Sequence, residues 1–299
     1  MFKEILVPLD GSRLAEVALP VAIHLAQQLQ ASITLLHVVE ANPPAKVHGQ
    51  PHLVTANDAQ AYLKKLTYNT VPHSMQVQQH VHVDPARDVA ESIVAHASEL
   101  QIDMIVMCSH GGSNLHRSLF GSIAQQVIRL DQTPLLLVNA EIPAPNFNCR
   151  RLLVTLDGDP AHEQGLTAAY QLAQQCQAQI GLVMVIPTPP TLQPPQSVTG
   201  RLLPYATTAL LDSQEPQARD YLLSKRSMFA DPDSLVICDV QRGEPATMIL
   251  ETALNINADL IVLATHGTTH LDAFGSSSVT SKLIAQAYLP LLLVPVVNP

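Results

Sequence analysis

Residues 5–11 read ILVPLDG, and residues 152–158 read LLVTLDG. The stretch IDMIVMCSHG at 102–111 likewise matches ADLIVLATHG at 258–267, and TPLLLV at 133–138 matches LPLLLV at 289–294. The three matches keep the same order in both halves, so chance explains them poorly. The displacement grows from 147 (5 to 152) to 156 (102 to 258), which places nine extra residues between Val185 and Glu244. The sequence therefore predicts a tandem duplication.

The two copies are separated by a segment that interrupts any regular element. Residues 141–149 read EIPAPNFNC, with two prolines and two asparagines. The 299 residues suffice for two domains that each bury a core. We therefore expect one domain over 1–142 and a second over 149–299.

Each copy alternates short apolar runs with amphipathic helical runs. Strands are expected in the first copy at 5–9, 33–39, 77–83, 104–108 and 135–138, and helices at 14–25, 57–68, 89–99 and after 122. This alternation predicts an α/β fold of two tandem doubly wound parallel-sheet domains, five strands each, with helices on both faces. Ligands of such sheets bind beyond the carboxyl ends of the strands, where the strand order reverses.

Composition and charge exclude several classes of protein. Hydrophobic residues make up 47% of the chain, and the net charge of −9 argues against a bare nucleic-acid surface. The opening MFKEILVPLD enters a strand at once, and no apolar run is long enough to cross a bilayer. The four cysteines lack CxxC or zinc spacing, which fits a reducing compartment. We expect a cytoplasmic protein that binds neither nucleic acid nor membrane.

The segment CSHGGSNLHRSLFGS at 108–122 follows an apolar strand and leads into a helix. A loop in this place can present backbone N–H groups to phosphate, and Gly111 and Gly112 permit a close approach of the main chain. Gly121 and Ser122 open the next helix, whose N-terminus is partly positive. Alternatively, the glycines form only tight turns and Ser122 only caps the helix. The chain has neither GxxxxGK[ST] nor GxGxxG.

The chain resembles the universal stress protein family, whose nucleotide-binding members carry G-x2-G-x9-G-[ST] after the fourth strand. Those positions fall here on Cys108, Gly111, Gly121 and Ser122, and the opening VPLD and the LLHVV strand also match. The resemblance implies the adenine nucleotide alpha-hydrolase-like fold and a site in the first copy for ATP, ADP or AMP, with or without Mg. The site residues it implies are Pro8, Asp10, Val38, Cys108, Ser109, His110, Gly111, Gly112, Ser113, Asn114, Gly121, Ser122, Ile123 and Ala124.

Two departures from the family pattern carry expectations of their own. Cys108 stands where the family has glycine, so its sulfur is expected to weaken binding by crowding the ribose, and the thiol to be buried and inert. The second copy has an eroded loop, because Ala264 and Ser277 occupy two of the glycine positions. Asp157 and Val185 persist there, but we expect much lower nucleotide occupancy than in the first copy.

The histidines and the remaining cation are weaker candidates. His37 lies within an apolar strand and is expected to be a hydrogen-bonded core residue. Arg117 either contacts the γ-phosphate or faces solvent. His110 and His116 are expected to be solvated, and nothing in the sequence converges on the pairs His48–His52 and His80–His82. We therefore expect no metal site and no catalytic residue.

These observations favour a nucleotide-binding regulatory protein of the stress response, whose nucleotide alters its contacts with an unidentified protein partner. A slow ATPase is a weaker alternative, because residues 108–122 contain no carboxylate to hold a metal ion. A nucleotide-free interaction module is the other. The apolar final strands at 133–138 and 289–294 would be exposed edges unless covered. We expect them to pair as an intramolecular pseudo-dimer, with pairing between two chains, as a homodimer, as the alternative.

Overall fold

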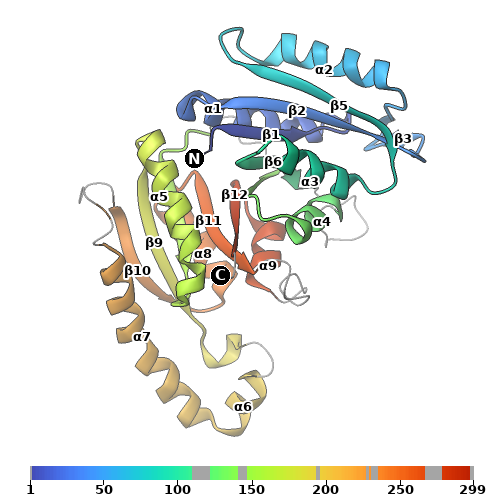
Figure 1. Cartoon of the computed structure of the whole chain (residues 1–299). Coiled ribbons are helices and arrows are strands. Elements are labelled where there is room, and N and C mark those ends of the chain that lie inside the picture. Colours follow the sequence, from blue (N-terminus) through green and yellow to red (C-terminus); the bar gives the residue numbers. More distant parts are fainter. Residues whose placement is uncertain are drawn as a thin grey trace.

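The computed structural model describes residues 2–109, 122–140, 147–192, 196–226, 229, 235–266 and 278–296. The chain forms two halves with the same succession of strands and helices (Figure 1). The first half contains β1 (Glu4–Pro8), α1 (Ala18–Leu29), β2 (Ser32–Glu40), α2 (Ala56–Thr70), β5 (Val77–Ala86), α3 (Val89–Glu99), β6 (Met104–Ser109), α4 (Ser122–Leu130) and β7 (Leu135–Asn139).

The second half repeats this series, with one added helix, α6, and with α7 in the place of α2. It contains β8 (Arg151–Leu156), α5 (Gln164–Cys176), β9 (Gln179–Ile186), α6 (Gln196–Leu202), α7 (Pro204–Arg226), β10 (Leu235–Arg242), α8 (Pro245–Asn255), β11 (Leu260–His266), α9 (Val279–Gln286) and β12 (Leu291–Val296). Short 3-10 turns, η1 (Ala15–Val17), η2 (Pro160–Glu163) and η3 (Pro189–Thr191), precede α1, α5 and α6.

The ten main strands form one sheet in the order β10-β9-β8-β11-β12-β7-β6-β1-β2-β5. Neighbouring strands within each half are parallel, and β1 pairs with both β2 and β6. The same arrangement holds around β8. The predicted α/β fold with five parallel strands in each half is therefore confirmed, and the strand order reverses at β1 and at β8.

The two halves meet through their final strands, as the apolar LLLV runs predicted. β12 pairs with β7 in antiparallel register, with Leu292 opposite Leu136. Side chains alternate between the two faces of the sheet, so this pair packs on one face while Leu137 and Leu291 pack on the other. The contact covers two strands that would otherwise be exposed apolar edges.

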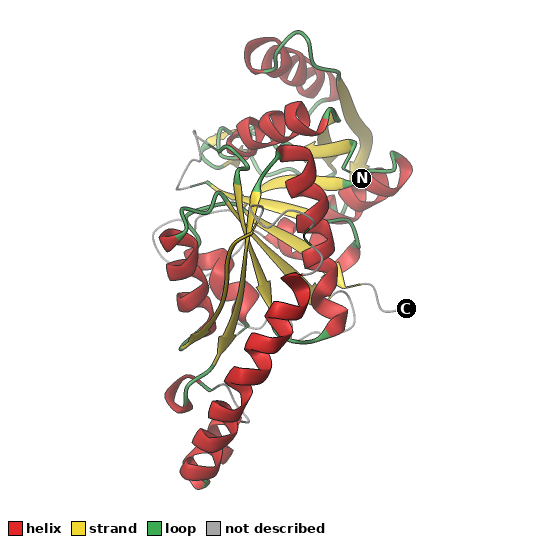
Figure 2. Cartoon of the chain, turned by 90° about the vertical axis from the view of Figure 1, so that its left-hand side faces the viewer, coloured by secondary structure: helices red, strands yellow, loops and turns green. Residues whose placement is uncertain are grey.

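Each face of the joined sheet carries its own continuous core. The helices α1, α2, α5 and α7 contribute buried residues to one core, and α3, α4, α8 and α9 to the other. Figure 2 shows the strands as a twisted layer with helices on both sides. Both cores extend across the two halves, so the halves fold as one packed body.

The extra residues of the second half lie in α6 and α7, which project beyond the sheet (Figures 1 and 2). α7 has 23 residues, and its second part packs on the sheet through Leu211, Ala218 and Leu222. In the described part of the chain, no helix is both long and apolar enough to cross a membrane.

Candidate functional site

A cavity of about 410 Å³ lies at the carboxyl ends of β1, β2 and β6, where the order of the strands reverses. The first turns of α3 and α4 close it on the other side. Seven of the site residues expected from the sequence line it, namely Pro8, Asp10, Val38, Cys108, Ser122, Ile123 and Ala124. The structure thus brings together expected residues from four separate segments of the first half.

Ser109, the one other expected residue that the structure describes, is not among the residues that line this cavity. Ser109 is buried at the end of β6, and its hydroxyl donates to the carbonyl of Val138 at 3.3 Å. Its role is to tie β6 to β7. The remaining expected residues lie outside the described residues, and they are His110, Gly111, Gly112, Ser113, Asn114 and Gly121.

A tight turn after β1 fixes the carboxylate of Asp10. Gly11 has a φ of +90°, a conformation that other residues rarely adopt, and a Cβ there would lie 2.8 Å from Leu53. The turn lets the backbone N–H of Ser12 donate to Asp10 Oδ1 at 2.8 Å, and Ser12 Oγ accepts from Ala15 N at 3.1 Å. Asp10 is therefore oriented at the mouth of the cavity before any ligand arrives.

His37 forms part of the cavity wall and is only 1% exposed. Its Nδ1 lies 2.7 Å from the carbonyl oxygen of Leu9, which can only accept, so Nδ1 carries the proton. Burial lowers the pKa of the imidazole, so the ring is neutral at physiological pH. The prediction of a hydrogen-bonded core histidine is confirmed.

A short hairpin covers the cavity, and the sequence analysis did not identify it. β3 (Lys46–Val47) and β4 (Gln50–Pro51) are joined by His48 and Gly49, which both have positive φ. This is the backbone of a two-residue I′-type turn, so the adjacent His-Gly pair was the available signal. The hairpin places His48 Nε2 3.6 Å from Asp10 Oδ2, beside the mouth of the cavity.

His52 follows the hairpin and holds it to the end of β2. Its Nε2 lies 3.1 Å from Glu40 Oε1, and its Nδ1 lies 3.1 Å from the carbonyl oxygen of Leu53. The side chain is only 2% exposed. Val47, His48, His52 and Glu40 all line the cavity, so the hairpin contributes to its polar end.

Cys108 lies at the junction of β6 with the cavity and is 4% exposed. Burial, together with the negative charge of Asp10, raises the pKa of the thiol to about 12. The thiol is therefore protonated at physiological pH and a poor nucleophile. The expectation of an inert, buried cysteine agrees with this position.

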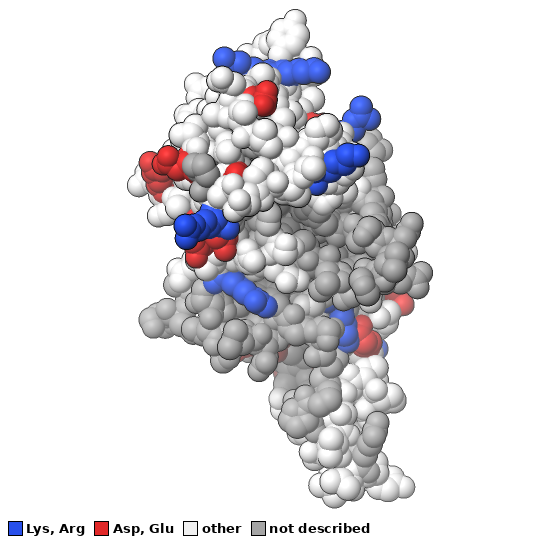
Figure 3. All heavy atoms as spheres, turned by 90° about the vertical axis from the view of Figure 1, so that its right-hand side faces the viewer, with Lys and Arg blue, Asp and Glu red and all other residues white. Residues whose placement is uncertain are grey.

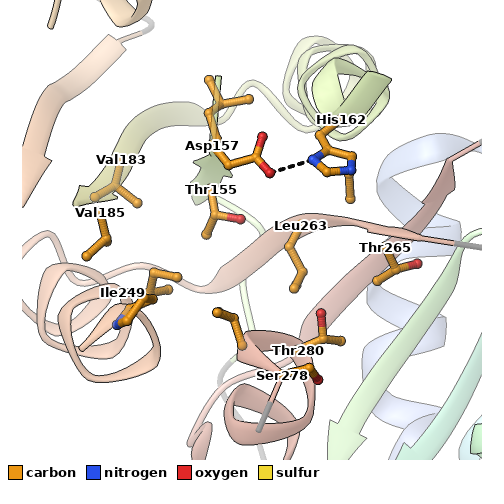
Figure 4. Close-up of a pocket in the computed structure, with 14 residues that line it drawn as sticks. Thr155, Asp157, His162, Val183, Val185, Ile249, Leu263, Thr265, Ser278 and Thr280 are labelled. Atoms are coloured by element: carbon orange, nitrogen blue, oxygen red, sulfur yellow. Dashed lines mark hydrogen bonds and ion pairs between the residues drawn. The ribbon is translucent and has the colours of Figure 1, made fainter. Parts of the chain in front are cut away.

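The second half has an equivalent cavity of about 600 Å³ (Figure 4). Asp157, Val185, Ala264 and Ser278 line it, at the positions that Asp10, Val38, Cys108 and Ser122 hold in the first half. The sequence analysis expected an eroded site here. The loop residues Gly267 and Ser277 lie outside the described residues. The walls that the structure describes enclose a cavity.

The carboxylate of the second cavity has a different partner. Asp157 Oδ2 accepts from His162 Nδ1 at 2.5 Å, as Figure 4 shows. Its Oδ1 accepts from the backbone N–H of Asp159 at 3.0 Å, after a glycine, Gly158, with a φ of +89°. The turn geometry is thus conserved between the halves, while the histidine comes from η2 instead of a hairpin.

Three histidines gather on the far side of the first half. On α3, His96 Nε2 lies 3.0 Å from His82 Nδ1, and its Nδ1 contacts the carboxylate of Glu99. The ring of His96 packs against that of His80. The sequence analysis found nothing that converges on His80 and His82, because His96 is adjacent only in space. Across the part of the chain that the structure describes, no group of three or more His, Cys, Asp or Glu has the arrangement of a metal site.

Comparison with known proteins agrees with this architecture. The model of the Universal stress protein family matches residues 1–139 and again residues 148–295. A universal stress protein of Mycolicibacterium smegmatis is 24% identical over 97% of this chain and 96% of its own length. Universal stress protein MJ0531 of Methanocaldococcus jannaschii is 30% identical over 46% of this chain and 82% of its own length.

A solved structure shows the same fold over the whole chain. The crystal structure of a universal stress protein from Archaeoglobus fulgidus covers 99% of both chains, with a TM-score of 0.66 and 14% identity. The two family matches together span nearly the whole sequence and coincide with the two halves of the sheet. The chain therefore belongs to the universal stress protein family, with two tandem copies of the family's domain.

Proposed function

We propose that the first half binds an adenine nucleotide, namely ATP, ADP or AMP, and that the chain is a cytoplasmic regulatory protein of the stress response. In this proposal the nucleotide alters contacts between this chain and a protein partner. The observation that carries it is the cavity at the reversal point of the strand order, where Asp10, Val38, Cys108 and Ser122 converge.

The chemistry of the cavity suits the parts of a nucleotide. Val38, Ile93 and Met107 supply apolar walls for a planar base. The carboxylate of Asp10 is an oriented acceptor for ribose hydroxyl groups. The N-terminus of α4, which begins at Ser122, carries a partial positive charge that favours phosphate.

Binding is favoured over hydrolysis because of where the carboxylates lie. Phosphoryl transfer needs a carboxylate that holds a metal ion beside the phosphates. Residues 108–122 contain none, and the described carboxylates of the cavity, Asp10 and Glu40, are paired with His48 and His52. An assay of phosphate release that shows turnover would replace this proposal with the ATPase alternative.

Titration calorimetry with ATP, in the presence and absence of magnesium, tests the proposal. The matched variants are Gly121→Val and Ser277→Val, which change equivalent positions of the two loops. A β-branched side chain at 121 is expected to abolish binding, and the same side chain at 277 to leave it unchanged. Binding that survives Gly121→Val, or is lost in Ser277→Val, contradicts a site in the first half.

A further inference from the structure

A third and larger hollow lies beside the helices that most distinguish the second half from the first. The groove has a volume of about 790 Å³ and runs between the end of β9 and the helices α6 and α7. α6 has no counterpart among the described helices of the first half, and α7, with 23 residues, is longer than its counterpart α2, which has 15.

The groove combines apolar walls with uncharged polar groups. Met184, Ile186, Leu192 and Leu211 offer aliphatic and thioether surface. The polar members are threonines, glutamines and Tyr221, and this phenol donates to Glu163 Oε1 at 3.0 Å. Such a surface suits an alkyl chain, which needs apolar contact and no specific donors.

One end of the groove carries a carboxylate. Asp157 is the only charged residue among the described residues of the groove, and it is paired with His162. Asp157 and Val185 also line the second-half cavity, so the groove and that cavity adjoin. An anionic head group would meet like charge here, whereas an uncharged or cationic group would not.

The segment before Asp212 carries few charged side chains, whereas Asp212 and Glu215 further along α7 pair with Arg242. Arg201 is the only Asp, Glu, Lys or Arg between positions 164 and 211. Around the groove Leu202 is 75% exposed, Leu203 58% and Leu210 60%. In Figure 3, the projecting lower end of the molecule shows described atoms in white without a blue or red group on that face. A surface of this kind marks a binding site.

We propose that this groove binds a small amphiphile with a single alkyl chain and an uncharged or cationic head group. The chain lies along Met184, Leu192 and Leu211, and the head lies toward Asp157. The site shares no residue with the cavity of the first half, so the inference does not depend on nucleotide binding there.

The direct test is calorimetric titration with three homologous series, n-alkyl alcohols, amines and carboxylates from six to twelve carbons, below micelle-forming concentrations. Each buried methylene contributes about 0.8 kcal/mol, so affinity should rise about fourfold per methylene until the groove is full. The carboxylates should bind at least about tenfold more weakly than the amines. Asp157→Asn should remove most of that difference.

Two neighbouring positions on α7 provide matched variants. Thr207 lines the groove, whereas Thr208 is exposed and is not among its residues. Thr207→Trp fills the groove and should weaken the dodecyl amine more than tenfold, while Thr208→Trp should leave it unchanged. Leu210→Gln is a second groove variant, and because Leu210 is exposed, this change should cost little stability.

Several results would overturn the inference. These are the failure of all three series to bind, an affinity independent of chain length, or equal effects of the two tryptophan variants. Light scattering provides a further discriminator. A contrary result would be that the chain self-associates through α6 and the start of α7, with Thr208→Trp or Leu210→Gln disrupting the association and no amphiphile competing with it. In that case the surface is an interface between copies of the chain.

Discussion

The two halves share a strand order, but their equivalent cavities differ in size and in cover. The first has a volume of about 410 Å³ and the second about 600 Å³. Two wall residues are smaller in the second cavity, which agrees with its larger volume: Val183 replaces Leu36 and Ala264 replaces Cys108. The first is also covered by the β3–β4 hairpin, whereas the second adjoins the groove beneath α7.

This difference shows which features of a duplicated fold are tied to its topology. The turn that holds Asp10 recurs at Asp157, because both carboxylates accept a backbone N–H at the end of the first strand. The partners of these carboxylates do not recur: His48 comes from the β3–β4 hairpin, and His162 comes from η2, at a position where η1 has Ala15. The turn at the carboxyl end of the first strand is thus retained in both halves. The segments that lie over each cavity differ, and they set what each half can bind.

The largest expected effect concerns the seam that joins the halves. Leu136 and Leu292 face each other across β7 and β12, and both are fully buried. Each leucine-to-alanine change should cost about 2–5 kcal/mol of unfolding free energy. Because the two side chains are in register, the double variant should depart from additivity by about 0.5–3 kcal/mol.

Urea denaturation of the wild type, the two single variants and the double variant measures this coupling. The control combines Leu136→Ala with Leu63→Ala on α2, at the other end of the first half, which should add within about 0.5 kcal/mol. Strict additivity of the Leu136 and Leu292 changes would show that the final strands do not form the interface in solution.

A smaller effect is expected at the helix caps of the two halves. Glu244 is the N-cap of α8. Its carboxylate accepts hydrogen bonds from Thr247 N at 2.8 Å and from Lys282 Nζ at 2.9 Å. Burial alone would raise its pKa, but the hydrogen bonds with Lys282 and Thr247 outweigh it and lower the pKa. Glu244→Gln should cost about 1 kcal/mol. Asp88→Asn at the equivalent cap of α3 should cost about 0.3 kcal/mol.

The pH dependence of the Glu244 effect follows from the direction of its shift. A carboxylate whose pKa is lowered by folding stabilises the native state above its unfolded pKa of about 4.3, and this contribution is lost as the pH falls through the folded value. The stability gap between wild type and Glu244→Gln should therefore be full at pH 7 and shrink below about pH 4. A gap that is constant with pH would refute the charge contribution.

The last expected effect is on ligand affinity and separates the two cavities at one position. Cys108→Gly removes a buried side chain from the wall of the first cavity and should tighten ATP binding by about 1 kcal/mol, roughly fivefold. Ala264→Gly makes the equivalent change in the second cavity and should not alter ATP affinity. An unchanged or weaker affinity of Cys108→Gly would show that the first cavity accommodates the thiol.

The repeated strands could be predicted because the pattern that defines them is local. The runs ILVPL and LLLV are apolar along their whole length, and parallel strands buried on both faces require that. The alternation of strands and helices then fixed the fold class. Even the pairing of β7 with β12 followed from sequence, because two uncharged edge strands cannot remain exposed.

The cover of the cavities could not be predicted, because it depends on contacts between distant segments. His48 lies beside Asp10 only because a six-residue hairpin, with strands too short to show a strand pattern, folds over the cavity. His96 meets His82 from another element in the same way, whereas His162 lies only five residues from Asp157 in the sequence. The groove beneath α7 has no sequence motif at all, since its residues are ordinary aliphatic and polar ones.

The stoichiometry of ATP binding to the intact chain tests the central claim most directly, namely that the first-half cavity binds ATP and the equivalent cavity of the second half does not. Titration calorimetry should give one ATP per chain, and Gly121→Val should abolish that binding while Ser277→Val preserves it. A stoichiometry of two, or heat of binding that persists in Gly121→Val and disappears in Ser277→Val, would contradict the account.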